Sequence, residues 1–155
     1  MLASLDFTLN LKSPKDRLFE LITTYEKYPD FLPQQIREVK ILENDFKKTI
    51  TEETLYFKTF FEKEIKQKSI HTKISDHELH TKILEGPAKN SEIFIDFSES
   101  VDGTTVKIKI KLHVSLKYKI LVPVIKRWYK LMLTSVLYKM EALLNKVEKS
   151  EDVSK

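Results

Sequence analysis

Two adjacent glutamates, Glu52 and Glu53, are the residues of this sequence best suited to acid–base chemistry. They lie within residues 48–57, where threonines, Ile50, Leu55 and aromatic residues predict a strand. Because neighbouring strand residues point to opposite faces, one of the two carboxyl groups should face the inner side of a sheet. There it would be desolvated and could act as a general acid or base. If the strand twists or bulges, both carboxyl groups instead reach water.

Three histidines, His71, His77 and His80, lie close together in the sequence, which raises the question of a metal site. A predicted hairpin that turns near Asp76 and His77 would separate them, and would set His80 opposite Lys73. No His-x-His or His-Glu-x-x-His spacing is present, so surface histidines are the better interpretation. No Gly-x-Ser-x-Gly motif presents a nucleophile. We therefore assign no catalytic residue, no metal and no cofactor from the sequence.

The absence of cysteine excludes disulfides, thiolate metal ligands and thiol nucleophiles. The net charge of +4 arises from lysines scattered among glutamates, as in residues 62–68, and this mixture is typical of a solvated sheet face. No nucleic-acid partner is expected, because aromatic residues are not interleaved with the lysines. The alternating N-terminal residues do not resemble a signal peptide, and no stretch is long and apolar enough to span a membrane. We expect a cytoplasmic protein.

Alternating apolar and polar residues predict seven strands, the clearest of which runs from Thr104 to Leu116. The first runs from Ala3 to Lys12, and the others cover residues 36–42, 48–57, 62–74, 78–84 and 91–98. A short helix should follow Pro14 and end near Thr24, and prolines limit Tyr25–Pro33 to a second short helix or a helical turn.

One long helix should begin at Pro123 and end near Val147. Its predicted apolar side is formed by Ile125, Trp128, Tyr129, Met132, Val136, Met140, Leu143 and Val147. The order of the elements predicts one α+β domain over residues 1–147, followed by a polar tail over residues 148–155. In this helix-grip fold a curved seven-stranded antiparallel sheet wraps around the long C-terminal helix, with two short helices after the first strand.

Two short motifs support this fold. The segment Tyr25-Glu26-Lys27-Tyr28-Pro29-Asp30-Phe31-Leu32-Pro33 resembles the Tyr-Pro-x-Phe-Leu-Pro stretch of the coenzyme Q-binding and polyketide cyclase/dehydrase families of the START-related superfamily. The segment Leu84-Glu85-Gly86-Pro87-Ala88-Lys89, followed by Phe97, resembles their Leu-x-Gly-Pro-Phe-Lys signature. Ala88 and Ile95 stand where these families often have aromatic residues, so the ligand cannot be carried over from them.

The resemblance implies a cavity between the concave sheet face and the last helix, closed by the short helices. From the predicted inward faces and the short helices, we expect the ligand-binding residues to be Phe19, Phe31, Leu32, Phe57, Ile95, Phe97, Ile110, Trp128, Tyr129, Met132 and Val136. Phe31 and Leu32 would form a movable cap over the entrance. Phe57, Phe60 and Phe61 form a further aromatic cluster, of which at least one member should face inward.

Three hypotheses for function remain open. The first is a protein that binds, and transports or presents, a hydrophobic small molecule such as a lipid, an isoprenoid quinone or a polyketide-like compound. Its scattered lysines would allow transient contact with anionic membranes. The second is a polyketide cyclase/dehydrase-type enzyme that uses a pocket carboxylate. The third is an interaction with ribosomes or another protein, since one branch of the superfamily acts on ribosomes.

Overall fold

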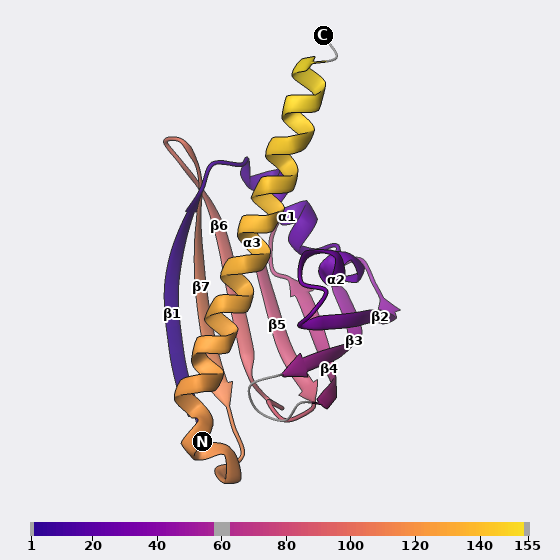
Figure 1. The fold of residues 1–155 in the computed structure, drawn as a ribbon, viewed down its shortest axis with the longest axis vertical. Coiled ribbons are helices and arrows are strands. Elements are labelled where there is room, and N and C mark those ends of the chain that lie inside the picture. Colours follow the sequence, from indigo (N-terminus) through magenta and orange to yellow (C-terminus); the bar gives the residue numbers. More distant parts are fainter. Residues whose placement is uncertain (1, 58–62, 154–155) are drawn as a thin grey trace.

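A single curved sheet of seven strands forms one layer of the molecule (Figure 1). The computed structural model describes residues 2–57 and 63–153. All neighbouring strands are antiparallel, in the order β1-β7-β6-β5-β4-β3-β2. The strands are β1 (Leu2–Leu11), β2 (Ile36–Asn44), β3 (Lys48–Phe57), β4 (Lys63–Lys73), β5 (Glu78–Glu85), β6 (Glu92–Ser100) and β7 (Gly103–His113).

Helices form the second layer, on the concave face of the sheet (Figure 1). They are α1 (Lys15–Ile22), the 3-10 helix η1 (Tyr25–Lys27), α2 (Tyr28–Phe31), the 3-10 helix η2 (Leu116–Leu121) and α3 (Val122–Val153). The long helix α3 crosses the sheet obliquely; α1 packs against α3 and β6, and α2 lies beside α3 and β2. The predicted helix-grip fold is therefore confirmed.

Two boundaries differ from the sequence-based prediction by three residues or more. Strand β7 ends at His113 and gives way to η2, although the apolar alternation continues to Leu116. Helix α3 continues beyond the predicted end at Val147 to Val153. Leu143 and Val147 are exposed, because these turns extend past the edge of the sheet and have no core to join (Figure 1).

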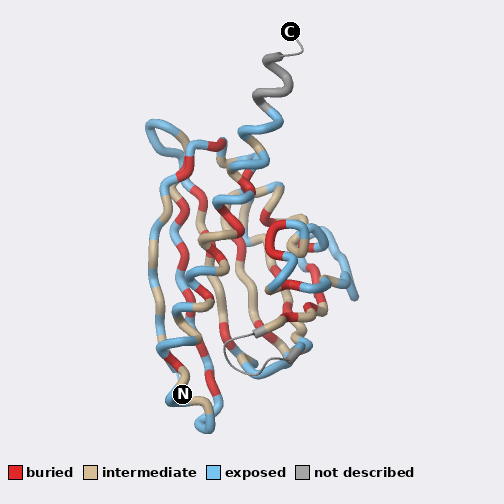
Figure 2. Tube along the Cα trace, viewed as in Figure 1, coloured by how far each residue is buried: buried red, intermediate tan, exposed pale blue. Residues whose placement is uncertain are grey.

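The core lies between α3 and the inner faces of β6 and β7, where buried residues alternate with exposed ones along the strands (Figure 2). Val106 and Ile108 of β7 share this core with Leu137 and Met140 of α3. Burial of such side chains stabilises the fold by about 1.5–3 kcal/mol each. None of the helices in the described part of the chain is long and apolar enough to cross a membrane.

Gly103, at the start of β7, is required by a close backbone approach. A Cβ atom there would lie 2.1 Å from the Leu11 carbonyl oxygen. We expect Gly103→Ala to lower the free energy of unfolding by about 3 kcal/mol, because backbone atoms must move apart. Urea denaturation followed by circular dichroism measures this loss.

Gly86→Ala is the matched control. Gly86 also has a positive φ, of 121°, but its added Cβ would meet the nearest heavy atom at an ordinary 3.4 Å. Only the backbone strain should then lower the free energy of unfolding, by about 1–2 kcal/mol. Equal losses in the two variants would contradict the steric explanation.

Candidate functional site

A small cavity of about 80 Å³ lies between α3 and the inner faces of β3 to β6. Its walls are mostly apolar and are formed by Ile22, Tyr28, Ile36, Leu55, Leu79, Ile83, Ile93, Ile95, Trp128, Tyr129, Met132, Leu133 and Val136. Polar side chains enter it from β3, β4 and β5: Glu53, Gln67, Ser69, His71 and Thr81. The cavity is therefore small and mostly apolar, with polar groups on one wall.

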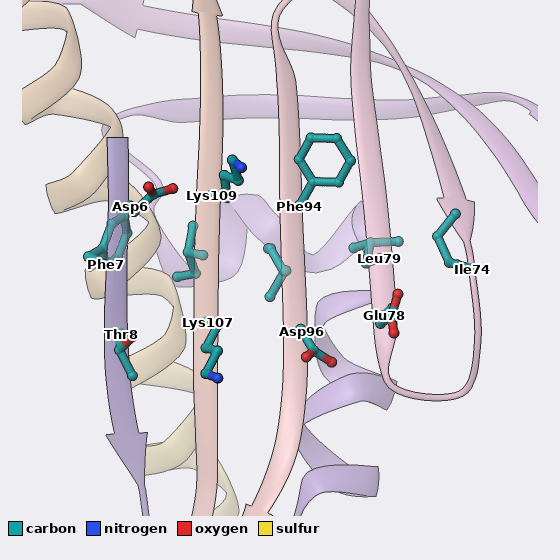
Figure 3. Close-up of a pocket in the computed structure, with 12 residues that line it drawn as sticks. Asp6, Phe7, Thr8, Ile74, Glu78, Leu79, Phe94, Asp96, Lys107 and Lys109 are labelled. Carbon is teal, nitrogen blue, oxygen red and sulfur yellow. The ribbon is translucent and has the colours of Figure 1, made fainter. Parts of the chain in front are cut away.

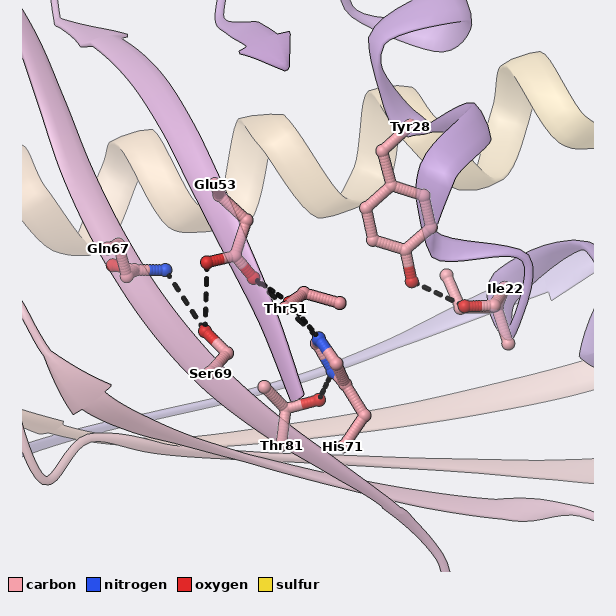
Figure 4. A network of polar contacts seen from close by, with 8 residues as sticks. All are labelled: Ile22, Tyr28, Thr51, Glu53, Gln67, Ser69, His71 and Thr81. Atoms are coloured by element: carbon pink, nitrogen blue, oxygen red, sulfur yellow. Dashed lines mark hydrogen bonds and ion pairs between the residues drawn. The ribbon is translucent and has the colours of Figure 1, made fainter. Parts of the chain in front are cut away.

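Glu53 faces this cavity and is only 7% exposed, whereas Glu52 points to the outer face. The Glu53 Oε1 atom accepts a hydrogen bond from the Thr51 hydroxyl at 2.7 Å, and the Glu53 Oε2 atom accepts one from the Ser69 hydroxyl at 3.2 Å (Figure 4). The prediction that one of the two glutamates faces inward is confirmed, and both of its oxygens have partners. Such partners offset much of the desolvation cost of a buried carboxyl group.

His71 lies beside Glu53 and is buried, so its interpretation as a surface histidine was wrong. Its Nε2 atom is 2.9 Å from the Thr51 hydroxyl, and its Nδ1 atom is 2.8 Å from the Thr81 hydroxyl. Because the single Thr51 proton is donated to Glu53, Nε2 must donate its own proton to Thr51. A continuous chain of hydrogen bonds therefore joins His71 to Glu53 through Thr51 (Figure 4).

The direct distance from His71 Nε2 to Glu53 Oε1 is 3.6 Å, close enough for an ion pair when the imidazole is protonated. His80 does not join this group. It pairs with Thr72 across the hairpin, one position from the predicted Lys73, and points to the opposite face of the sheet from His71. The pleat alternation separates the two histidines.

Three tyrosines border the polar group. The Tyr25 ring stacks on the His71 imidazole with centroids 4.1 Å apart, and the Tyr28 hydroxyl donates to the Ile22 carbonyl (Figure 4). Burial raises the pKa of Tyr25, and burial followed by the charge of Glu53 raises the pKa of Tyr129. These phenols therefore remain protonated and uncharged well into the alkaline range.

Five of the predicted ligand-binding residues line the cavity: Ile95, Trp128, Tyr129, Met132 and Val136. Phe19, Phe97 and Ile110 instead pack in the core, where the Phe19 and Phe97 rings meet edge to face at 5.9 Å. The side chain of Phe57, together with Phe60 and Phe61, lies outside the described residues. Contact of the lining residues with a ligand stays a prediction.

Phe31 and Leu32, the predicted cap, are buried in the core and do not belong to the cavity lining. The Lys139 ammonium of α3 donates to the Phe31 carbonyl at 2.7 Å and ties α2 to the long helix. This bond holds the cap against α3 in the conformation described. Their role as an entrance gate stays a prediction.

Thr51, Ser69, His71 and Thr81 were not predicted from the sequence to form one polar group. The available signal was a stripe of polar residues at every second position of two paired strands. Register then aligns them: Thr51 pairs with Ser69, and His71 pairs with Thr81. The stripe was overlooked because polar alternation ordinarily marks the solvated face of a strand.

The opposite, convex face carries a shallow hollow lined by residues of β1, β5, β6 and β7, charged ones such as Asp6 and Lys107 together with apolar ones such as Phe94 (Figure 3). At its edge His77, Glu78 and Asp96 offer three ligand atoms within 4.8 Å of one another. His77 Nδ1 is 2.9 Å from Asp96 Oδ1, so these side chains pair with each other. This face is a mixed-charge, solvated surface.

Comparisons with solved structures agree with this architecture. The Zhui aromatase/cyclase from Streptomyces sp. R1128 superposes with a TM-score of 0.79 at 12% identity, covering 91% of this chain and 94% of that one. TTHA0849 from Thermus thermophilus has a TM-score of 0.74 at 12% identity, covering 92% and 95%. A START superfamily protein from Mycobacterium smegmatis has a TM-score of 0.72 at 12% identity, covering 94% and 98%. At this identity the likeness shows the fold alone.

No curated protein matches the sequence. A family model described as polyketide cyclase / dehydrase and lipid transport matches residues 11–141, which include every strand from β2 to β7 and most of α3. The match confirms the resemblance found in the sequence motifs. The chain therefore belongs to the polyketide cyclase / dehydrase and lipid transport family.

Proposed function

We propose that this protein binds a hydrophobic small molecule carrying one polar group, in the cavity between the sheet and α3. One observation carries the proposal: the cavity is lined by apolar side chains on most sides and by Glu53, Ser69 and His71 on the remaining wall, where hydrogen bonds, two of them to Thr51, hold these polar groups. Apolar surface supplies affinity at about 25 cal/mol per Å², while a few polar groups fix orientation.

The two sides of the cavity differ in how far they can adapt. Glu53 and His71 are held by hydrogen bonds on rigid neighbouring strands, so they form a preorganised wall. On the facing side Met132 is unbranched and polarisable, and it lies beside Trp128 on a half-buried part of α3. The polar group of the ligand would meet the wall, and its apolar body would meet the adaptable helix side.

The size of the cavity constrains the binding event. At about 80 Å³ it is well below the roughly 300–1,000 Å³ of sites for drug-sized ligands. A lipid, an isoprenoid quinone or a polyketide-like compound therefore requires Trp128 and Met132 to move outward. The family's lipid-transport members favour a carrier that opens to load and closes to shelter its cargo.

A second candidate function is acid–base catalysis on the bound molecule. It is favoured by the convergence of two ionisable groups, Glu53 and His71, at the cavity wall, joined through the Thr51 hydroxyl. Aromatase/cyclases share this fold, as the Streptomyces protein illustrates. In this alternative Glu53 would move a proton to or from a substrate held in the cavity.

Filling the cavity tests the binding site. Val136 is buried at its edge, so Val136→Phe should lower the affinity for the neutral apolar probe N-phenyl-1-naphthylamine at least tenfold, because the ring occupies the ligand's space. Fluorescence titration of the folded variant measures the effect. Leu131→Phe, on the exposed side of α3, is the matched control and should bind as the wild type does. Unchanged binding by Val136→Phe would rule out this cavity.

Glu53→Gln separates the two candidate functions, because it removes the charge but keeps the shape. A binding protein should return its extracted ligand unaltered and should bind a hydroxyl-bearing ligand about tenfold more weakly in the variant. An enzyme should convert its substrate, and the variant should lose roughly 10²–10⁴ of the rate. Mass spectrometry of the ligand before and after incubation distinguishes these outcomes.

Glu52→Gln is the matched control for this substitution. Glu52 is the adjacent residue on the outer face, 3.9 Å from the exposed Lys66 ammonium. The Glu52→Gln substitution should leave both ligand affinity and turnover unchanged. If the two variants behave alike, Glu53 has no special role and the polar wall does not orient the ligand.

A further inference from the structure

One end of the molecule exposes aliphatic side chains that no described element covers. Helix η2 contains no buried residue, and its Leu116 and Ile120 are 77% and 87% exposed. Val124, in the first turn of α3, is also exposed. We call residues 115–127 the basic tip. It lies at the opposite end of the molecule from the C-terminus (Figures 1 and 2).

The charge of the basic tip is uniformly positive. From Gly103 to Met140 the sequence contains no Asp or Glu, although the whole chain has 23 of them against 27 Lys and Arg. Within the basic tip Lys117, Lys119 and Arg127 are exposed beside the aliphatic residues. The positive excess of the chain is therefore concentrated in this region.

The neighbouring loop does not neutralise this charge. The β5–β6 connection borders the same surface hollow as η2 and contributes Gly86, Pro87, Lys89 and Asn90. Lys89 adds a further exposed cation, and His113 and Ser115 complete the border without an acid. An anionic partner would meet no acidic side chain among the residues that line this hollow.

Exposed aliphatic side chains with lysines beside them are suited to binding an anionic membrane. Leucine and isoleucine can enter the boundary between headgroups and acyl chains, while each nearby Lys or Arg contributes about 1 kcal/mol with anionic lipids. The most exposed apolar side chains of the basic tip, Leu116 and Ile120, offer no ring on which nucleic-acid bases could stack. We propose that the basic tip docks on anionic lipid bilayers, with Leu116 and Ile120 inserted.

The location of the basic tip connects this docking to the cavity. Val124 precedes Trp128 by one helical turn, so the two side chains are neighbours on α3, and Trp128 lines the cavity. Docking would thus hold the adaptable wall of the cavity near the lipid surface. Docking itself requires no ligand in the cavity.

Vesicle flotation tests the proposal with the full chain. The wild type should bind vesicles of phosphatidylcholine with about one third phosphatidylserine, and bind pure phosphatidylcholine only weakly. Leu116→Ser with Ile120→Ser should reduce binding at least tenfold through lost apolar burial. Lys117→Glu with Lys119→Glu should reduce it roughly 30-fold or more, and added salt should weaken the wild type similarly.

Matched controls lie at other hairpins of the sheet. Phe46 and Val101 are also strongly exposed, so Phe46→Ser with Val101→Ser removes comparable apolar surface away from the basic tip. Lys47→Glu with Lys48→Glu likewise reverses two exposed lysines there. Both controls should bind as the wild type does. The proposal is overturned if wild-type protein ignores anionic vesicles, if it prefers neutral ones, or if tip and control variants bind equally.

Discussion

The concave face of the seven-stranded sheet is wider than the one long helix that packs on it. The rest of this structure follows from that difference in width. An α-helix with its side chains is about 10–12 Å wide, whereas seven strands extend over roughly 29 Å. Helix α3 therefore fills the space above β6 and β7 with Leu137 and Met140, which are fully buried. Towards β2 and β3 the shorter helices complete the cover, and the cavity remains between α3 and the inner faces of β3 to β6.

The polar wall exists because the inner faces of β3 and β4 carry Thr51, Glu53, Ser69 and His71 instead of aliphatic residues. Buried polar groups destabilise a fold unless they are hydrogen-bonded, and each of these four has a partner within the group. The same bonds that make the arrangement tolerable also fix its geometry. A molecule entering the cavity would meet oriented groups on the sheet and deformable ones on α3.

The connection between β7 and α3 explains why the basic tip is exposed. After β7 the chain must turn back to begin α3, and it does so through η2, beyond the last core residues. Leu116 and Ile120 therefore have no buried surface to join, while Val122 already packs into the core. The turn that closes the helix-grip fold thus leaves aliphatic and basic side chains together beside Trp128.

The sequence alone determined the order of elements, because periodic apolar residues and prolines act locally: the seven strands, the short helices after Pro14 and the long helix from Pro123 are all present. It also identified Trp128, Tyr129, Met132 and Val136 as one face of that helix, which is the face that lines the cavity. Only the tertiary structure determines that Glu53 points inward, that His71 is buried and how large the cavity is. Each depends on strand register and on packing between segments far apart in the chain, and local periodicity carries no information about either.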